Sequence, residues 1–133
     1  MIAALENSPV GDADPTGGGF AFASGMAATS SVLDLLTAGD HVVAMDDVYG
    51  GTQRMFRLVR ARSQGLEFEF TDLSDTAKFA EAMTARTALV WVETPTNPTL
   101  KVADLAAIAE IAKKKNPDVL LACDNTFASP INQ

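Results

Sequence analysis

The sequence predicts an α/β fold with a mostly parallel β-sheet and helices on both of its faces. Short apolar and β-branched runs alternate with amphipathic segments of helical length along the chain. The most apolar of these runs, Thr87 to Val92, is typical of a buried parallel strand. It ends at Glu93, and two prolines follow, which cannot donate to a sheet ladder. In open α/β sheets ligands bind at the carboxyl ends of strands, so the loop after Glu93 is expected to carry a site.

Composition narrows the classes of partner. A chain of 133 residues is long enough for one domain with a core, and nothing marks a second domain. A net charge of -7 and a pI near 4.5 disfavour nucleic acid, because a phosphate backbone requires a basic face. The basic residues of one segment are interpreted as a solvated helix face rather than an RNA site: Arg54, Arg57, Arg60 and Arg62.

The sequence also bears on membrane contact and on the redox compartment. No apolar run reaches the length of a membrane span, and the N-terminus does not resemble a signal peptide. We therefore expect no membrane partner. Cys123 is the only cysteine, so no internal disulfide can form, which favours a reducing cytoplasm.

The first part of the chain is poor in signals. Residues 1–19 are rich in turn formers and are predicted to be a loop that follows a short helical end at Ile2 to Leu5. A strand is then expected at Phe20 to Ala23. A helix opening at Ser24-Gly25-Met26 is expected to run to about Leu36, with Gly39 just past its end.

The rest of the chain alternates regularly. The predicted strands are 41–45, 66–70, 87–92 and 119–123, and the predicted helices are 52–62, 77–83 and the segment that begins after Asp104. Ser74 or Asp75 is expected to cap the helix at 77–83, and Asp104 the last helix. Lysines 113–115 lie at the C-terminus of that helix, where cations complement its dipole.

The first polar cluster at a strand end is Ser24-Gly25-Met26. A small residue and a glycine at a helix start expose backbone N–H groups, which suits a phosphate. Taken alone, Ser24 is more typical of a plain N-cap.

The second cluster, Asp46 to Gly51, contains the chain's only tyrosine. Beside two glycines Tyr49 could lie flat against a planar ligand, and packing at a turn is an equal alternative. Asp46 and Asp47 could indicate a metal or general acid–base site. The favoured interpretation is that one caps the next turn and the other is solvated.

The third cluster is Glu93 to Asn97, and the fourth is Asp124-Asn125-Thr126. An aspartate that emerges from an apolar strand is costly unless it has a partner. A cationic ring nitrogen would be such a partner, and the carboxylate would in turn keep that nitrogen protonated. A neighbouring backbone N–H is the alternative partner.

Together the four clusters resemble the Cys/Met-metabolism family of pyridoxal-phosphate enzymes. The stretches that carry the resemblance are Ala21 to Ala28, Met45 to Thr52, Trp91 to Pro98 and Asp124 to Pro130. The family contains cystathionine γ-lyase and γ-synthase, which the motifs resemble most, and cystathionine β-lyase and methionine γ-lyase, which are the alternatives. The resemblance implies that residues 20–133 are part of the large cofactor-binding domain of a fold-type I enzyme.

The resemblance also implies roles. Ser24, Gly25 and Met26 would hold the cofactor phosphate through backbone N–H groups, and Tyr49 would stack on the pyridine ring. Asp124 would pair with the ring nitrogen. Asn97 would contact the phenolic oxygen, Glu93 would support its loop, and Thr126 would lie beside the ring. The implied reaction is elimination or replacement on a sulfur amino acid or an activated homoserine, a small-molecule substrate.

One family feature has no match in the 133 residues. The family's Schiff-base lysine follows a Ser-x-Thr-Lys stretch, and no lysine here has that context. Lys101, the nearest to the central loop, is expected at the surface of a helix start. The chain is therefore expected to be a central fragment without lyase activity of its own, and the full protein a homotetramer. A non-catalytic phosphate-binding α/β module is the alternative, although no dinucleotide or Walker motif is present.

Overall fold

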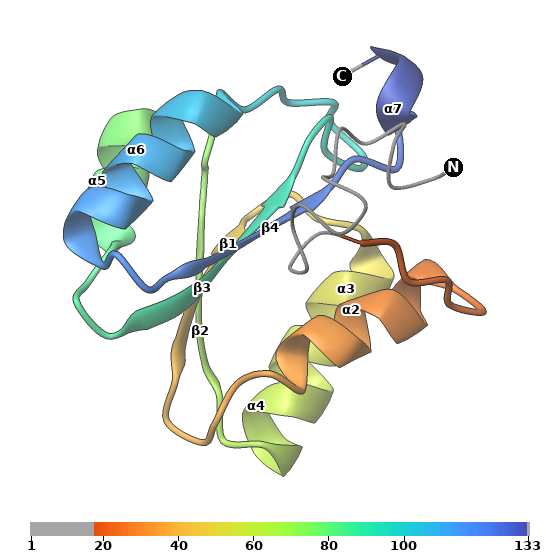
Figure 1. Cartoon of the computed structure of the whole chain (residues 1–133), viewed down its shortest axis with the longest axis horizontal. Coiled ribbons are helices and arrows are strands. Elements are labelled where there is room, and N and C mark those ends of the chain that lie inside the picture. The colour runs from red at the N-terminus through yellow and green to blue at the C-terminus, as the bar shows by residue number, and fades with distance from the viewer. Residues whose placement is uncertain (1–17, 133) are drawn as a thin grey trace.

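The computed structural model describes residues 18–132 and contains one four-stranded sheet in the order β2-β1-β3-β4 (Figure 1). Every neighbouring pair of strands is parallel. In chain order the elements are α2 (Gly25–Leu33), β1 (His41–Met45), α3 (Gly50–Arg54), the π-helical turn η1 (Met55–Arg60), α4 (Ala61–Ser63), β2 (Glu67–Thr71), α5 (Thr76–Ala82), β3 (Thr87–Glu93), α6 (Leu105–Lys115), β4 (Leu120–Asp124) and α7 (Ser129–Asn132).

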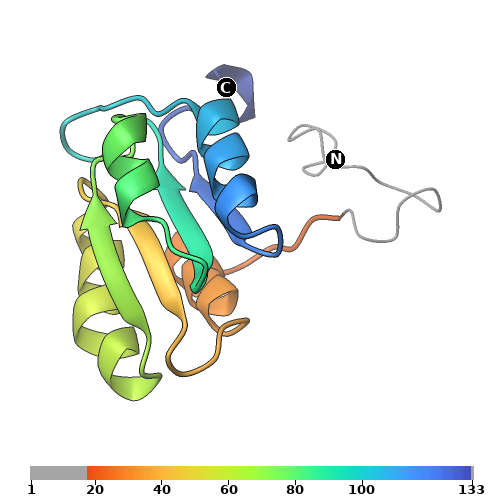
Figure 2. The ribbon, with the colours of Figure 1, turned by 90° about the vertical axis from the view of Figure 1, so that its left-hand side faces the viewer.

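Helices cover both faces of the sheet, which confirms the predicted architecture. Helices α2, α3 and α4 lie on one face, and α5 and α6 lie on the other (Figures 1 and 2). Among the described helices none combines the length and apolarity needed to cross a bilayer.

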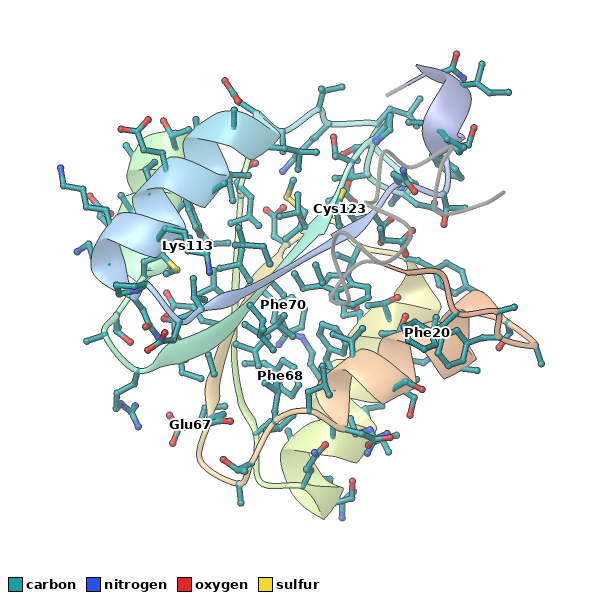
Figure 3. All side chains as sticks on the ribbon, in the orientation of Figure 1. Phe20, Glu67, Phe68, Phe70, Lys113 and Cys123 are labelled. Atoms are coloured by element: carbon teal, nitrogen blue, oxygen red, sulfur yellow. The ribbon has the colours of Figure 1, made fainter. Side chains whose placement is uncertain are left out.

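The core is divided between these two faces. On the α2–α4 side the buried Phe56 ring stacks on Phe68 at 4.8 Å between centroids and meets Trp91 edge-on at 5.6 Å. Figure 3 shows Phe68 and Phe70 on this side of the sheet. On the other side, α5 and α6 contribute the buried Phe79 and Ile108. Both layers are anchored on β1, in which all five residues are buried.

The predicted caps of the second helical layer are confirmed. The Asp75 carboxylate accepts hydrogen bonds from the N–H groups of Ala77 and Lys78 at the start of α5. Asp104 accepts from Ala107 N–H at 3.0 Å at the start of α6. The Lys113 ammonium donates to the carbonyl of Val119 at 2.7 Å and so ties the end of α6 to the entry of β4.

Two predicted helix boundaries were wrong. Helix α2 ends at Leu33 rather than Leu36, because the backbone there changes to i→i−3 hydrogen bonds, from Leu35 to Val32 and from Leu36 to Leu33. The Gln64 side-chain amide donates to the carbonyls of Leu33 and Leu36 at this end. The helix predicted at 52–62 begins two residues earlier, at Gly50, and contains the π-helical turn η1.

The strand predicted at Phe20 to Ala23 was also wrong. This segment is irregular coil, and Phe20 is 88% exposed. A strand requires a neighbour to complete its ladder, and none of the four described strands pairs with this segment. The helical end predicted at Ile2 to Leu5 and most of the predicted loop at 1–19 lie outside the described residues.

The strand order creates a crevice between β1 and β3. From β1 the chain crosses to β2 on one side, and it then returns to β3 on the other side of β1. The carboxyl ends of β1 and β3 therefore flank a topological switch point, which is where open α/β sheets bind ligands.

Candidate functional site

A cavity of about 410 Å³ lies at this switch point. The residues that line it come from α2, from the loop after β1 and the start of α3, from the end of β3 and the loop after it, and from the end of β4 and the turn after it. All eight residues singled out in the sequence are among them: Ser24, Gly25, Met26, Tyr49, Glu93, Asn97, Asp124 and Thr126. The structure thus brings together segments that are up to about 100 positions apart in the chain, and their roles toward a ligand remain predictions.

The start of α2 forms one wall. The Ser24 hydroxyl accepts from Ala27 N–H at 3.1 Å, so the serine is a true N-cap. The N–H groups of Gly25 and Met26 come before Ala27, the first residue whose N–H donates to a carbonyl of the helix start, and both residues line the cavity. The N-cap and the anion-binding interpretations are therefore compatible, because the serine uses its hydroxyl and leaves these two donors.

The Glu93 carboxylate joins two other walls of the cavity, the loop after β1 and the loop after β3. It is 4% exposed, and it accepts from Tyr49 N–H at 2.9 and 3.1 Å and from Asn97 N–H at 3.0 Å. Burial raises the pKa of Glu93; its two N–H partners lower it, and the charges of Asp124 and Asp47 raise it further. Glu93 therefore acts on the cavity mainly by fixing the backbones of Tyr49 and Asn97.

Asp124 lies at the last position of β4, directly beside Glu93 in the parallel register. Its Oδ1 atom accepts from Thr126 N–H at 3.1 Å and from the Thr126 hydroxyl at 2.5 Å. The predicted alternative, a backbone N–H partner for the aspartate, is thus realised. Both bonds go to Oδ1, which leaves Oδ2 as an acceptor for a cationic donor in the cavity.

The expectation that Asp46 or Asp47 caps the next turn was wrong, whereas Asp46 is exposed, as expected for the solvated one of the pair. Neither side chain caps α3, whose N-cap is Tyr49 without a side-chain hydrogen bond. Asp47 accepts from Thr96 and Thr99, and Asp46 pairs with Lys101 at 3.1 Å. Among the described residues no group of three or more potential ligands could hold a metal ion.

Lys101 also differs from its prediction as a surface residue at a helix start. Its side chain is 29% exposed, and its ammonium contacts Asp46 at 3.1 Å and Asp72 at 2.9 Å. The hydrogen bonds from Ser74 and Lys101 lower the pKa of Asp72 to about 2. The same pairing with Asp72 and Asp46 raises the pKa of Lys101, so this amine stays charged rather than nucleophilic.

Four lining residues were missed in the sequence: Thr29, Thr52, Pro95 and Phe127. Thr29 lies one turn after Gly25, and its hydroxyl donates to the Gly25 carbonyl at 2.9 Å. Helical spacing from Gly25 could have indicated it. Phe127 is 50% exposed at the cavity, and an exposed aromatic beside a strand-end aspartate was the available signal.

The donors around the cavity suit a phosphorylated, aromatic and cationic ligand. The α2 N-terminus offers N–H groups for a phosphate, Tyr49 offers a ring, and Asp124 offers a carboxylate. No lysine or arginine is among the lining residues of the described chain, so within this lining the helix start is the source of positive potential. Fold and site together define a cofactor-binding α/β domain of the type that holds a phosphorylated ring.

Comparison with known proteins makes the assignment specific. A sequence profile of the Cys/Met metabolism PLP-dependent enzyme family matches residues 2–133. The chain belongs to this family, whose members are enzymes that use pyridoxal 5′-phosphate.

Individual relatives agree. Cystathionine β-lyase of Coxiella burnetii is 62% identical over 115 residues, which are 86% of this chain and 29% of the relative. Cystathionine γ-lyase of Mus musculus is 54% identical over 109 residues, 82% of this chain and 27% of the relative. A probable cystathionine γ-synthase of Herpetosiphon aurantiacus is 47% identical over 112 residues, which are 84% of this chain and 34% of the relative.

Solved structures show the same fold. The crystal structure of metB from Corynebacterium glutamicum superposes with a TM-score of 0.85 at 40% identity, over 97% of this chain and 31% of that one. Cystathionine γ-lyase from Lactobacillus plantarum, complexed with L-serine, also gives 0.85, at 44% identity and the same coverage. The chain therefore spans about a third of the length of the proteins it matches.

Proposed function

We propose that this chain forms the pyridoxal-phosphate cradle of a transsulfuration enzyme of the cystathionine γ-lyase or γ-synthase type. The observation that carries the proposal is that eight residues chosen from sequence motifs line one cavity at the switch point of the sheet. The substrate class is a sulfur amino acid or an activated homoserine. The L-serine complex of the Lactobacillus plantarum γ-lyase supports a small amino acid as the substrate.

Each wall of the cavity has a role in this proposal. Gly25 and Met26 N–H groups bind the phosphate, Tyr49 stacks on the ring, and Asn97 orients its phenolic oxygen. The Asp124 carboxylate holds a proton on the ring nitrogen, because an anion beside it favours the charged form. When bound, the cofactor supplies an electron sink for negative charge that develops on the substrate.

Further parts of the proposal rest on the family alone. The full protein is proposed to be a homotetramer, with additional phosphate-binding residues from a neighbouring subunit, which would supply the positive charge that the described lining lacks. Neither nucleic acid nor a membrane is proposed as a partner. The single cysteine supports a cytoplasmic location. Elimination at the β-carbon is the second candidate, and the Coxiella burnetii relative, a β-lyase, favours it.

The test is an assay of the full protein with cystathionine, in which 2-oxobutanoate reports γ-elimination and pyruvate reports β-elimination. Asp124→Ala is expected to lose cofactor on dialysis and at least 100-fold in turnover, roughly the loss for a positioned catalytic group. Asp118→Ala, an exposed aspartate just before the same strand, is the matched control and is expected to keep both. Normal turnover by Asp124→Ala would contradict the role of Asp124.

A protein of only these 133 residues is expected to release no measurable 2-oxobutanoate, because no lysine in it has the Ser-x-Thr-Lys context. Cofactor-dependent release by the purified 133-residue protein would overturn that part of the proposal.

A further inference from the structure

Two loops meet beside the cavity through one carboxylate that the sequence motifs left without a role. Asp47 lies in the loop after β1, two residues before Tyr49. Its Oδ2 atom accepts from the Thr96 hydroxyl at 2.6 Å, from Thr99 N–H at 3.0 Å and from the Thr99 hydroxyl. Asp47 therefore ties the loop after β1 to the loop after β3, across 49 and 52 positions of sequence.

The receiving turn is closed on itself. Thr96 is fully buried, its hydroxyl oxygen accepts from Lys101 N–H at 2.8 Å, and its own N–H donates to the Lys101 carbonyl at 3.0 Å. Asn97, which lines the cavity, follows Thr96 directly. A restraint on the position of Thr96 therefore also restrains Asn97, which is the next residue in the chain.

Glu93 ties the same two loops on the cavity side. Its carboxylate accepts from Tyr49 N–H and from Asn97 N–H. The two loops are thus joined by carboxylate contacts at Glu93 and Asp47, and also by the Asp46–Lys101 ion pair further from the cavity. Of these, the Asp47 contact holds the residue next to Asn97, so it restrains the separation of Tyr49 and Asn97 together with Glu93.

The Asp47 tie is charge-assisted. Partial burial raises the pKa of Asp47, but the hydrogen bonds from Thr96 and Thr99 outweigh it and hold the pKa below its ordinary range. The carboxylate is therefore ionised at neutral pH, and hydrogen bonds to an ionised acceptor are about twice as strong as neutral ones.

We propose that Asp47 is a positioning residue of the cofactor site, which fixes the spacing of Tyr49 and Asn97 across the cavity by holding the Thr96–Thr99 turn. This inference rests on the proposed function for its cofactor, whereas the restraint on the two loops can be tested without it.

The experiment compares Asp47→Ala and Asp47→Asn with Asp40→Ala in the full protein that carries this sequence, freed of cofactor. Asp40 is the matched control, because its carboxylate also accepts from a threonine N–H and hydroxyl, those of Thr37, but at the amino end of β1. Residue-resolved amide hydrogen exchange measures the restraint, thermal unfolding measures stability, and equilibrium dialysis measures pyridoxal-phosphate affinity.

Asp47→Ala is expected to speed exchange at the amides of Tyr49, Asn97 and Thr99 by about tenfold, the effect of losing a charge-assisted hydrogen bond. It is also expected to weaken cofactor binding by about tenfold. Asp47→Asn, which keeps an acceptor oxygen, should recover part of both losses. Asp40→Ala should change neither, even if it lowers the unfolding temperature as much.

Faster exchange at Thr99 with no change at Tyr49 and Asn97 would overturn the proposal, since the tie would then be local. Faster exchange at all three amides with unchanged cofactor affinity would show that the Asp47 contact does not matter to cofactor binding, and would overturn the proposed role of Asp47 in the site. If Asp47→Ala does not fold, Asp47→Asn and the exposed Thr99→Val, which removes one donor, give the same comparison. A wild-type protein that binds no cofactor would refute the proposed function, and the exchange data would still judge the restraint.

Discussion

Among single residues, Gly51 decides where the Tyr49 ring can lie. A Cβ atom built at Gly51 would overlap Tyr49 Cε1 and come within 3.0 Å of Tyr49 Cδ1 and 3.2 Å of Met26 Sδ. At the neighbouring Gly50 a Cβ would meet only the Arg54 guanidinium, at an ordinary 3.4 Å. The two adjacent glycines therefore differ in the space around them. Gly50 has room for a side chain, whereas Gly51 is in contact with the Tyr49 ring and has none.

Gly51→Ala is expected to displace the Tyr49 ring and to weaken pyridoxal-phosphate binding by about tenfold, the contribution of one aromatic stacking contact. Gly50→Ala is the matched control and should bind normally. Equilibrium dialysis measures both. Equal affinity in the two variants would show that this position of the ring does not matter to binding.

Among the elements, the segment α3–η1–α4 shows what the sequence could and could not reveal. The predicted apolar side of this helix, Met55, Phe56, Leu58 and Val59, was only partly right. Phe56 is buried and Met55 packs against the core, whereas Leu58 and Val59 are exposed. The π-helical turn was not predicted. Its wider, i→i+5 hydrogen-bond spacing shifts the pattern of apolar residues too little to be recognised in a natural sequence. The Phe56 ring of this segment packs on Phe68 of the edge strand β2 and on Trp91 of the more central β3.

Phe56→Ala is expected to lower the free energy of unfolding by about 3–5 kcal/mol, because it leaves a large cavity among three aromatic rings. Leu58→Ala, in the same turn but 61% exposed, should change it by less than about 0.5 kcal/mol. Urea denaturation followed by circular dichroism distinguishes them. A similar loss in both variants would mean that the two side chains are equally buried in solution.

The predictable and unpredictable parts of the site differ in how locally the sequence encodes them. Glu93 and Asp124 could be found from sequence, because each is a carboxylate at the end of an apolar strand, and parallel strands end at one edge. The tie from Asp47 to Thr96 could not, since it joins residues 49 positions apart through a loop whose path no local pattern fixes. The strand wrongly expected at Phe20 to Ala23 shows the converse limit: a short apolar run becomes a strand only beside a partner.

For the whole molecule, Asp72 couples stability to pH through its hydrogen bond from Ser74 and its ion pair with Lys101, which also pairs with Asp46. The two ion pairs of Lys101 join the end of β2, the loop before α6 and the end of β1. The pKa of Asp72 is about 2 in the folded chain against an ordinary 3.8, so the unfolded chain binds its proton first as the pH falls. The stability that Asp72 contributes is therefore complete above pH 3.8 and is lost as the pH falls toward about 2.

Asp72→Asn is accordingly expected to be less stable than the wild-type protein at neutral pH, with a difference that shrinks through this acidic window. Urea denaturation at a series of pH values measures it, and the exposed Glu110→Gln on α6 serves as the control. A difference that stays constant down to pH 2 would contradict the lowered pKa of Asp72 and the hydrogen bonds from Ser74 and Lys101 to which it is assigned.

The most direct test of the proposed cofactor site is an amide NMR titration of the protein with pyridoxal 5′-phosphate, beside a parallel titration with pyridoxal. We expect the phosphorylated ligand to shift the amide signals of Gly25 and Met26 together with those of Tyr49, Asn97 and Asp124, and pyridoxal to shift the last three only weakly. Shifts confined to residues outside the cavity, or none at Gly25 and Met26 at saturation, would contradict the assignment of this cavity as the cofactor site.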